Sequence, residues 1–159
     1  MPQYKAKRRV RHSADDMFSL VVDMERYPEF VPLCSDMRVR GRTEIGAGVE
    51  VATARMTVAY KVIREYFTTR VTMHRPELWI KVEYLDGPLN VLSNRWSFRP
   101  LGETVSEVEF FIDYEFKSRI LSALMGAVFD AAFRRFATAF ERRADEVYGI
   151  NRARALASG

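Results

Sequence analysis

The chain has 159 residues, 48% hydrophobic and 29% charged, which suits one globular domain that folds without a metal or a disulfide. Its formal charge of +4 favours an anionic partner, such as a phospholipid surface or RNA, without selecting between them. The single cysteine, Cys34, excludes an internal disulfide, so we expect a buried structural thiol in a reducing compartment.

The N-terminal half begins with a strand and short helices. Residues 3–12 alternate, which predicts a strand with a basic outer face. Ser13, followed by Asp15 and Asp16, has the form of a helix N-cap. Residues 27–33 are aromatic and too proline-rich for a long helix. No apolar segment suited to a secretory signal or a membrane span follows, so we expect a cytoplasmic protein of bacterial type.

The middle of the chain, from about residue 35 to 116, has a hydrophobic period of two, which indicates strands joined by hairpins. We expect these strands at residues 36–44, 48–61, 66–74, 78–86, 91–100 and 104–116. Residues 118–148 then predict one long helix, ended by Gly149. We expect a single domain over residues 1–149 and a frayed tail over residues 150–159.

This order predicts an α+β fold, in which a sheet of about seven antiparallel strands curves round the long C-terminal helix. Two short helices follow the first strand. Periodicity does not distinguish a packed core from a cavity, but a sheet curved round one helix encloses more space than that helix fills. Asn94 is the one polar side chain that we place inward, where it could hydrogen-bond a ligand or a backbone group.

Residues suited to catalysis are scarce at inward positions. His12 and His74 lie at the ends of elements and have no metal-ligand spacing, so we expect solvated turn residues. Nucleophile-elbow, phosphate-loop and zinc-protease motifs are missing. We therefore expect no catalytic residues, no metal and no catalytic cofactor.

Several motifs together resemble one family along nearly the whole chain. They are Phe30-Val31-Pro32, Asp86-Gly87-Pro88, Asn94-Arg95-Trp96 with Leu92 and Phe98, Pro100-Leu101-Gly102, and Val147-Tyr148-Gly149. The chain resembles the coenzyme-Q-binding START-domain family on these residues. It departs from that pattern at Leu33, where a Trp is frequent, and at Ser93, where an acidic residue is common.

The resemblance implies a helix-grip fold around a hydrophobic tunnel that carries ubiquinone or another polyprenyl lipid, in support of respiration and quinone synthesis. On that basis we expect the tunnel to be lined by Phe30, Leu33, Val58, Tyr60, Trp96, Phe98, Phe110, Ile112, Val128, Phe129 and Phe133. It also implies peripheral association with the inner membrane, with Leu121, Leu124 and Met125 as contacts. These three residues belong to residues 120–129, which carry no charge. The alternative is that residues 120–129 are simply the buried part of the helix.

Two other functions stay open. Bacterial relatives in the same family are described as ribosome-association toxins, and the basic residues Lys5, Lys7, Arg9, Arg11, Arg134, Arg135, Arg142 and Arg143 would then contact RNA phosphates. We rank this reading lower because the sequence shows no interleaving of aromatic and basic residues. A polyketide cyclase is the third reading, since the helix-grip fold hosts such enzymes, but the fold alone does not grant the function. We expect no DNA partner.

Overall fold

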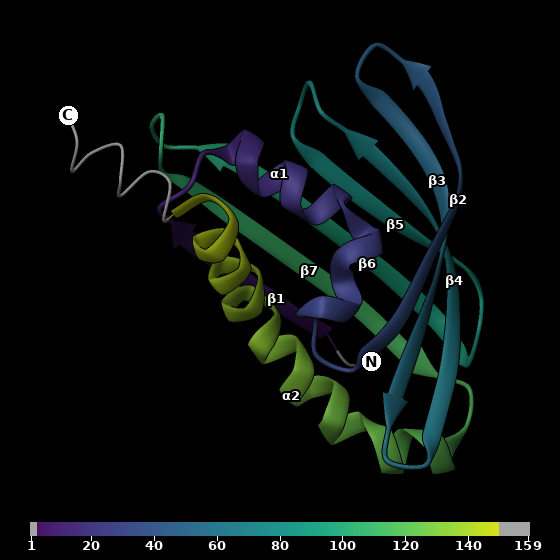
Figure 1. Cartoon of the computed structure of the whole chain (residues 1–159). Coiled ribbons are helices and arrows are strands. Elements are labelled where there is room, and N and C mark those ends of the chain that lie inside the picture. The colour runs from purple at the N-terminus through teal and green to yellow at the C-terminus, as the bar shows by residue number, and fades with distance from the viewer. Residues whose placement is uncertain (1–2, 150–159) are drawn as a thin grey trace.

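The computed structural model describes residues 3–149, in which seven strands form one antiparallel sheet that curves round a long helix (Figure 1). The elements in chain order are β1 (Gln3–Val10), α1 (Ala14–Val22), η1 (Met24–Glu29), β2 (Cys34–Gly46), β3 (Val49–Tyr60), β4 (Ile63–His74), β5 (Trp79–Asp86), β6 (Leu89–Pro100), β7 (Ser106–Phe116), α2 (Arg119–Ala144) and η2 (Asp145–Gly149). The predicted fold class is confirmed. The predicted frayed tail lies outside the described residues, and the domain limits stay a prediction.

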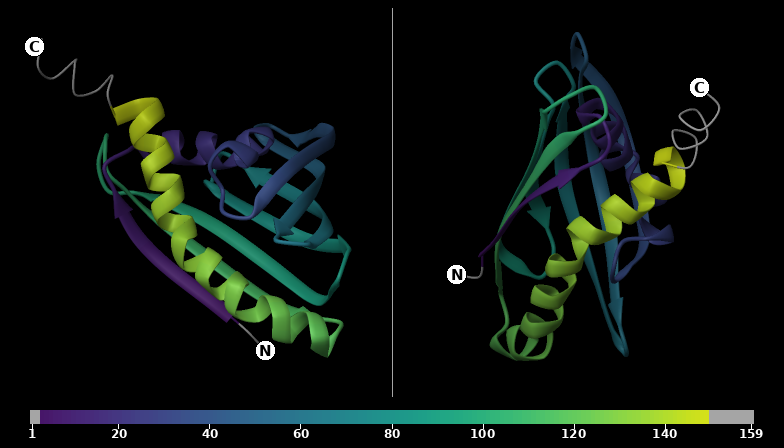
Figure 2. Two further views of the ribbon diagram at one scale, coloured as in Figure 1. Left: turned by 60° about the horizontal axis from the view of Figure 1, so that its bottom comes forward. Right: turned by 90° about the vertical axis from the view of Figure 1, so that its left-hand side faces the viewer.

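The strand order in the sheet is β1-β7-β6-β5-β4-β3-β2. Six strands therefore form a meander, and β1 pairs with β7 at the far edge. Figure 2 shows α2 crossing the concave side of the bent sheet, and α1 packs on this side against β6, β7 and α2. The concave face is thus covered by helices, and the convex face is left open.

Both long elements of the helical layer start at serine caps. The Ser13 hydroxyl accepts a hydrogen bond from the Asp16 amide at 3.0 Å, as the sequence pattern predicts. The Ser118 hydroxyl accepts one from the Leu121 amide at 3.2 Å. α2 carries Arg142 and Arg143 in its last turn, where cations stabilise the helix dipole.

Two local expectations were wrong. β4 begins at Ile63 rather than residue 66, because Lys61 adopts a positive φ of 54° and a two-residue connection suffices to reverse the chain. His12 is not a solvated turn residue, since it is 1% exposed. Its Nε2 atom lies 2.7 Å from Asp145 Oδ1, so the turn after β1 is covered by the C-terminal end of the helical layer.

Candidate functional site: an apolar cavity

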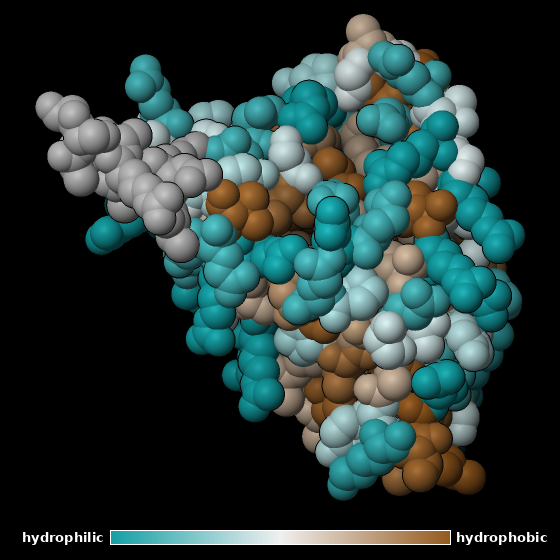
Figure 3. All heavy atoms as spheres, viewed as in Figure 1, coloured by the Kyte–Doolittle hydropathy of each residue, from teal (hydrophilic) through white to brown (hydrophobic). Residues whose placement is uncertain are grey.

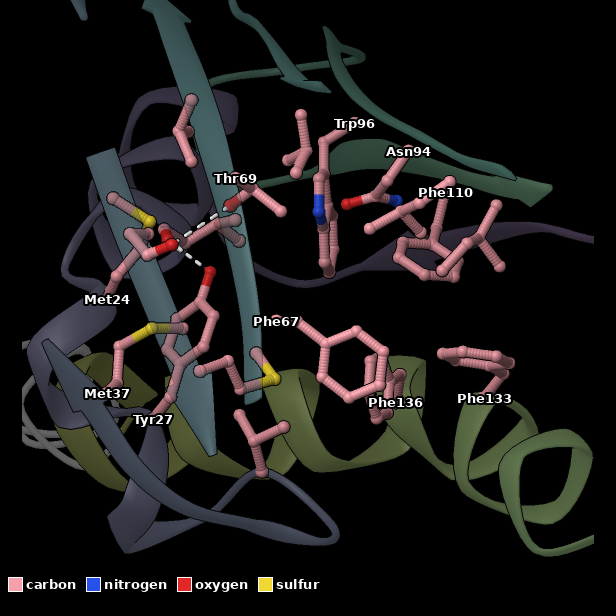
Figure 4. Close-up of a pocket in the computed structure, with 18 of the residues that line it drawn as sticks. Met24, Tyr27, Met37, Phe67, Thr69, Asn94, Trp96, Phe110, Phe133 and Phe136 are labelled. Carbon is pink, nitrogen blue, oxygen red and sulfur yellow. Dashed lines mark hydrogen bonds between the residues drawn. The ribbon is translucent and has the colours of Figure 1, made fainter. Parts of the chain in front are cut away.

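A cavity of about 140 Å³ lies between the concave face of the sheet, η1 and α2 (Figure 4). Its wall is assembled from α1, η1, the loop before β2, strands β2 to β7, and α2. The inward side chains of the strands alternate with outward ones, so a single sheet face supplies most of the wall. The cavity therefore lies where the sheet and the long helix diverge.

The predicted lining residues divide into two groups. Leu33, Val58, Trp96, Phe110, Ile112, Phe129 and Phe133 line the cavity. Phe30, Tyr60, Phe98 and Val128 do not, and those four predictions were wrong for this cavity. Periodicity identified the inward face correctly but not the depth at which each side chain lies.

Each of the four residues is placed elsewhere by packing. Phe98 lies under α1, with its ring centroid 5.7 Å from that of Phe18. Phe30 packs edge-on against Phe140 at 5.0 Å. Tyr60 and Val128 are half-buried at the margin of the core.

Methionines line the cavity beyond the predicted set. Met24, Met37, Met56 and Met73 all belong to the wall, and Figure 4 shows Met24 and Met37 beside Tyr27. The signal for Met37, Met56 and Met73 was the alternation of their strands. A flexible, polarizable methionine side chain adapts to irregular space, which suits a wall that contacts ligands of varied shape.

Most polar groups in the wall are already occupied. Tyr27 donates to the Val21 carbonyl at 2.5 Å, and Thr69 donates to the Ala54 carbonyl at 3.5 Å, as the dashed lines in Figure 4 mark. Asn94, inward as predicted, donates from Nδ2 to the Phe111 carbonyl at 2.8 Å. Trp96 Nε1 is different, because among residues 3–149 no group accepts its hydrogen bond. The Tyr114 hydroxyl, also in the wall, has no hydrogen-bond partner among these residues either. The indole and this hydroxyl are therefore free donors in a mostly apolar wall.

Ionisable groups near the cavity are held neutral. Burial raises the pKa of Tyr27, which lies in the wall. Burial also raises the pKa of the nearby Cys34 thiol to about 11, so that thiol is protonated at neutral pH and is buried as predicted. The lining residues within 3–149 include no Asp, Glu, His, Lys or Arg. The described part of the chain holds no cluster of His, Cys, Asp and Glu that could hold a metal.

Aromatic contacts join the sheet to α2 around the cavity. Phe67 of β4 meets Phe129 with centroids 6.0 Å apart, and Trp96 meets Phe140 at 4.9 Å. Leu33, in the loop before β2, lines the cavity with a positive φ of 69°, a conformation that is strained for a leucine. The cavity is therefore bounded by ring contacts between the sheet and α2 and by one strained loop residue.

One end of the molecule exposes aliphatic side chains. Val62, between β3 and β4, is 98% exposed, and Ile120 and Leu124 in the first turns of α2 are 74% and 58% exposed. Figure 1 places both segments at the same end of the molecule, and Figure 3 shows hydrophobic atoms there. Of the predicted membrane contacts, Leu124 is exposed and Leu121 half-buried, whereas Met125 is 1% exposed and packs in the core, so its prediction was wrong. No described helix is long and apolar enough to cross a bilayer.

The chain belongs to the polyketide cyclase/dehydrase and lipid transport family, whose model matches residues 10–141. This bears out the family relationship that the sequence motifs indicated.

Similar proteins carry two kinds of name. The ribosome association toxin RatA of Vibrio cholerae is 36% identical over 94% of this chain and 99% of its own length. The mitochondrial coenzyme Q-binding protein COQ10 of Drosophila melanogaster is 33% identical over 86% of this chain. The matched region covers 56% of the length of that protein. The solution structure of CC1736 from Caulobacter crescentus matches with a TM-score of 0.76 and 34% identity over 94% of this chain and 99% of that one.

An enzyme also shares the fold. The Zhui aromatase/cyclase from Streptomyces sp. R1128 matches with a TM-score of 0.74, over 91% of this chain and 93% of that one. Its identity is 16%, so this likeness shows the fold alone.

Proposed function

We propose that the chain binds ubiquinone or another polyprenyl quinone without catalysing a reaction, and that it delivers this lipid in support of respiration and quinone synthesis. The observation that carries the proposal is the mostly apolar cavity, in whose wall Trp96 Nε1 is a donor with no acceptor among residues 3–149. A quinone would supply this acceptor, because its flat ring carries carbonyl oxygens that accept hydrogen bonds. The lipid transport part of the family description and the coenzyme Q-binding relative support the same ligand class.

The cavity volume suggests how such a ligand would lie. At about 140 Å³ it resembles the engineered cavity of about 150 Å³ that binds benzene. It therefore has room for one ring, while a polyprenyl tail has to extend beyond it. We propose that the head group enters the cavity and that the tail parts the aromatic contacts between the sheet and α2. Burial of the tail would contribute roughly 25 cal/mol per Å² of apolar area.

Delivery requires contact with a bilayer, for which we propose the end that carries Val62, Ile120 and Leu124. Lys61 and Arg119 adjoin these side chains in sequence and are exposed, which suits anionic lipid headgroups. The protein would then be cytoplasmic and peripherally associated with the inner membrane. Replacement of Val62 and Leu124 by Asp should abolish binding to vesicles of phosphatidylglycerol and leave quinone binding in detergent intact.

Tryptophan fluorescence offers a direct test of quinone binding. Trp96 lines the cavity, whereas Trp79 lies on β5 outside it, stacked on His74 with ring centroids 4.8 Å apart. Short-tailed ubiquinone should quench the wild type and the Trp79→Phe variant and leave the residual emission of Trp96→Phe largely unchanged. Mass spectrometry of lipid extracted from the purified protein should find a quinone or its precursor. The proposal fails if extracts contain none and reconstitution gives no saturable quenching.

Ribosome association is a second candidate function, favoured by the relative of 36% identity that carries this name. It predicts co-sedimentation with ribosomes that weakens steeply as salt rises, because phosphate contacts release counterions. Quinone binding predicts little dependence on salt. A cyclase activity receives less support, since the described cavity wall offers no Asp, Glu, His or Lys for proton transfer, and burial raises the pKa of its tyrosines Tyr27 and Tyr114.

A further inference from the structure

Four arginines lie together on the convex face of the sheet, on β2, β3 and β4. Arg38 of β2 lies directly opposite Arg55 of β3. In the adjoining row, Arg40 and Arg70 lie opposite Thr53 from either side. We call this set, Arg38, Arg40, Arg55 and Arg70, the arginine face.

The arginine face points away from the cavity. Arg55 stands between Ala54 and Met56, and both of these neighbours line the cavity. Arg70 stands in the same way between Thr69 and Val71. Because successive side chains of a strand point to opposite faces, the arginines project from the convex face, and all four are exposed.

Counter-charges are sparse on the arginine face. Arg38 pairs with Asp36 at 3.1 Å, but Arg40, Arg55 and Arg70 form no ion pair with any residue in 3–149. Glu83 of β5 lies opposite Arg70 in register without forming one. Like charges directly opposite each other destabilise a sheet, so a bound polyanion would relieve the repulsion between Arg38 and Arg55.

At the opposite edge of the convex face, some positive charges are balanced by ion pairs. There Lys5 pairs with Glu109 at 3.4 Å, and Arg99 pairs with Glu107 at 3.2 Å. Lys81 of β5 and Arg95 of β6 lie opposite each other on the same face and also form no ion pair within 3–149, so unpaired positive charge continues from the arginine face onto β5 and β6.

An aromatic ring adjoins the arginine face. The Arg55 guanidinium carbon lies 4.4 Å from the centroid of the Tyr66 ring, and Tyr66 is 44% exposed. Aromatic rings and guanidinium planes are the surfaces on which proteins stack unpaired RNA bases. The sequence showed no interleaving of aromatic and basic residues, because Arg55 and Tyr66 belong to different strands and the sheet brings them together.

We propose that the arginine face, with Tyr66, binds RNA. One guanidinium group can donate two parallel hydrogen bonds to two phosphate oxygens. Two rows of arginines on neighbouring strands can therefore contact successive phosphates of an RNA backbone. A lipid surface fits less well, because a bilayer held on the convex face would lie across the sheet from the cavity. This inference deepens the second candidate function and does not depend on what the cavity binds.

The test measures fluorescence anisotropy of a labelled single-stranded RNA of mixed sequence over a range of salt. The Arg40→Gln, Arg70→Gln double variant should bind roughly ten-fold more weakly, and the slope of log affinity against log salt should fall by about 1.4, at 0.7 for each lost phosphate contact. The matched control is Arg26→Gln, Lys117→Gln, which removes the same charge from exposed positions on η1 and before α2 and should retain most of the affinity. Tyr66→Leu should weaken binding about five-fold or more through lost stacking.

Three results would overturn the proposal. They are an equal loss of affinity in the two double variants, no RNA binding by the wild type at 100 mM salt, or loss of phosphatidylglycerol vesicle binding alone in the Arg40 and Arg70 variant. Thermal unfolding should be unchanged in both double variants, since all four side chains are exposed. If the protein binds RNA through the arginine face but does not co-sediment with ribosomes, the second candidate function is refuted. The proposal that the arginine face binds RNA would still stand.

Discussion

Trp96 and Phe110 lie opposite each other on the β6–β7 pair, with ring centroids 4.7 Å apart and ring planes inclined at 68°. Both rings line the cavity. The edge-to-face contact fixes the indole plane, and with it the direction in which Trp96 Nε1 can donate. The free donor is therefore held in place before any ligand arrives, which reduces the entropy lost on binding.

Trp96→Phe tests the contribution of that donor. The phenyl ring keeps an aromatic wall but removes the N–H group, and a neutral hydrogen bond contributes about 0.5 to 1.5 kcal/mol. Ubiquinone affinity, measured by calorimetry in detergent, should fall by about 2- to 10-fold. Trp79→Phe, outside the cavity, should bind like the wild type, and equal affinities in all three proteins would argue against the donor.

Ala132→Leu tests whether the cavity is the binding site. Ala132 lies on α2 with its side chain in the wall, so a leucine there fills empty space. The variant should unfold at a higher temperature and lose most quinone binding, since cavity filling commonly adds about 0.5 to 2 kcal/mol of stability at the expense of function. The adjacent Ala131 is exposed, so Ala131→Leu should alter neither property. Undiminished quinone binding by Ala132→Leu would place the ligand elsewhere.

Asp145→Ala tests the tie between His12 and the end of the helical layer. His12 is buried, and within 3–149 its Nδ1 atom has no hydrogen-bond partner, so loss of Asp145 would leave both ring nitrogens without one. We expect the free energy of unfolding in urea to fall by about 1 to 3 kcal/mol. Glu146→Ala changes the next exposed carboxylate and should cost much less. Equal effects would show that the pair with His12 contributes nothing specific.

The Cys34 thiol predicts a loss of stability at alkaline pH. Its pKa is raised to about 11 by burial, so the folded state holds the proton more tightly than the unfolded state does. The stabilisation is therefore full below the thiol's ordinary pKa and is lost as the pH rises toward 11. Urea unfolding between pH 8 and 11 should show a steeper decline for the wild type than for Cys34→Ala. Buried tyrosines such as Tyr27 have a raised pKa in both proteins, so they affect both stability curves alike. Parallel curves of stability against pH would therefore exclude the thiol as the cause.

The fold could be predicted because local signals agree with it. The clean alternation of β7 and the Ser13 cap before α1 are local, and each places an element correctly. The turn between β3 and β4 could not be placed. Lys61 adopts a positive φ there, and no glycine or asparagine nearby signals that conformation in the sequence.

The site could be predicted only in part. Trp96 and Phe98 share one strand face, yet only Trp96 reaches the cavity, because α1 covers Phe98. How deeply a side chain is covered depends on a segment distant in sequence. For the same reason, the sequence did not predict the burial of His12, because its partner Asp145 is far along the chain. Nor did it predict the contact of Arg55 with Tyr66, which lies on another strand.

The alternation of β3 has an evolutionary consequence. Ala54 and Met56 line the cavity, while Arg55 between them belongs to the opposite surface. A point mutation at one position can therefore alter a lipid ligand while its neighbour preserves a different partner, so selection can act on the two surfaces separately. An insertion or deletion within the strand would instead exchange the two surfaces over the length that it shifts. Lineages of this family can thus diverge in partner by point substitution while the spacing of the strand stays fixed.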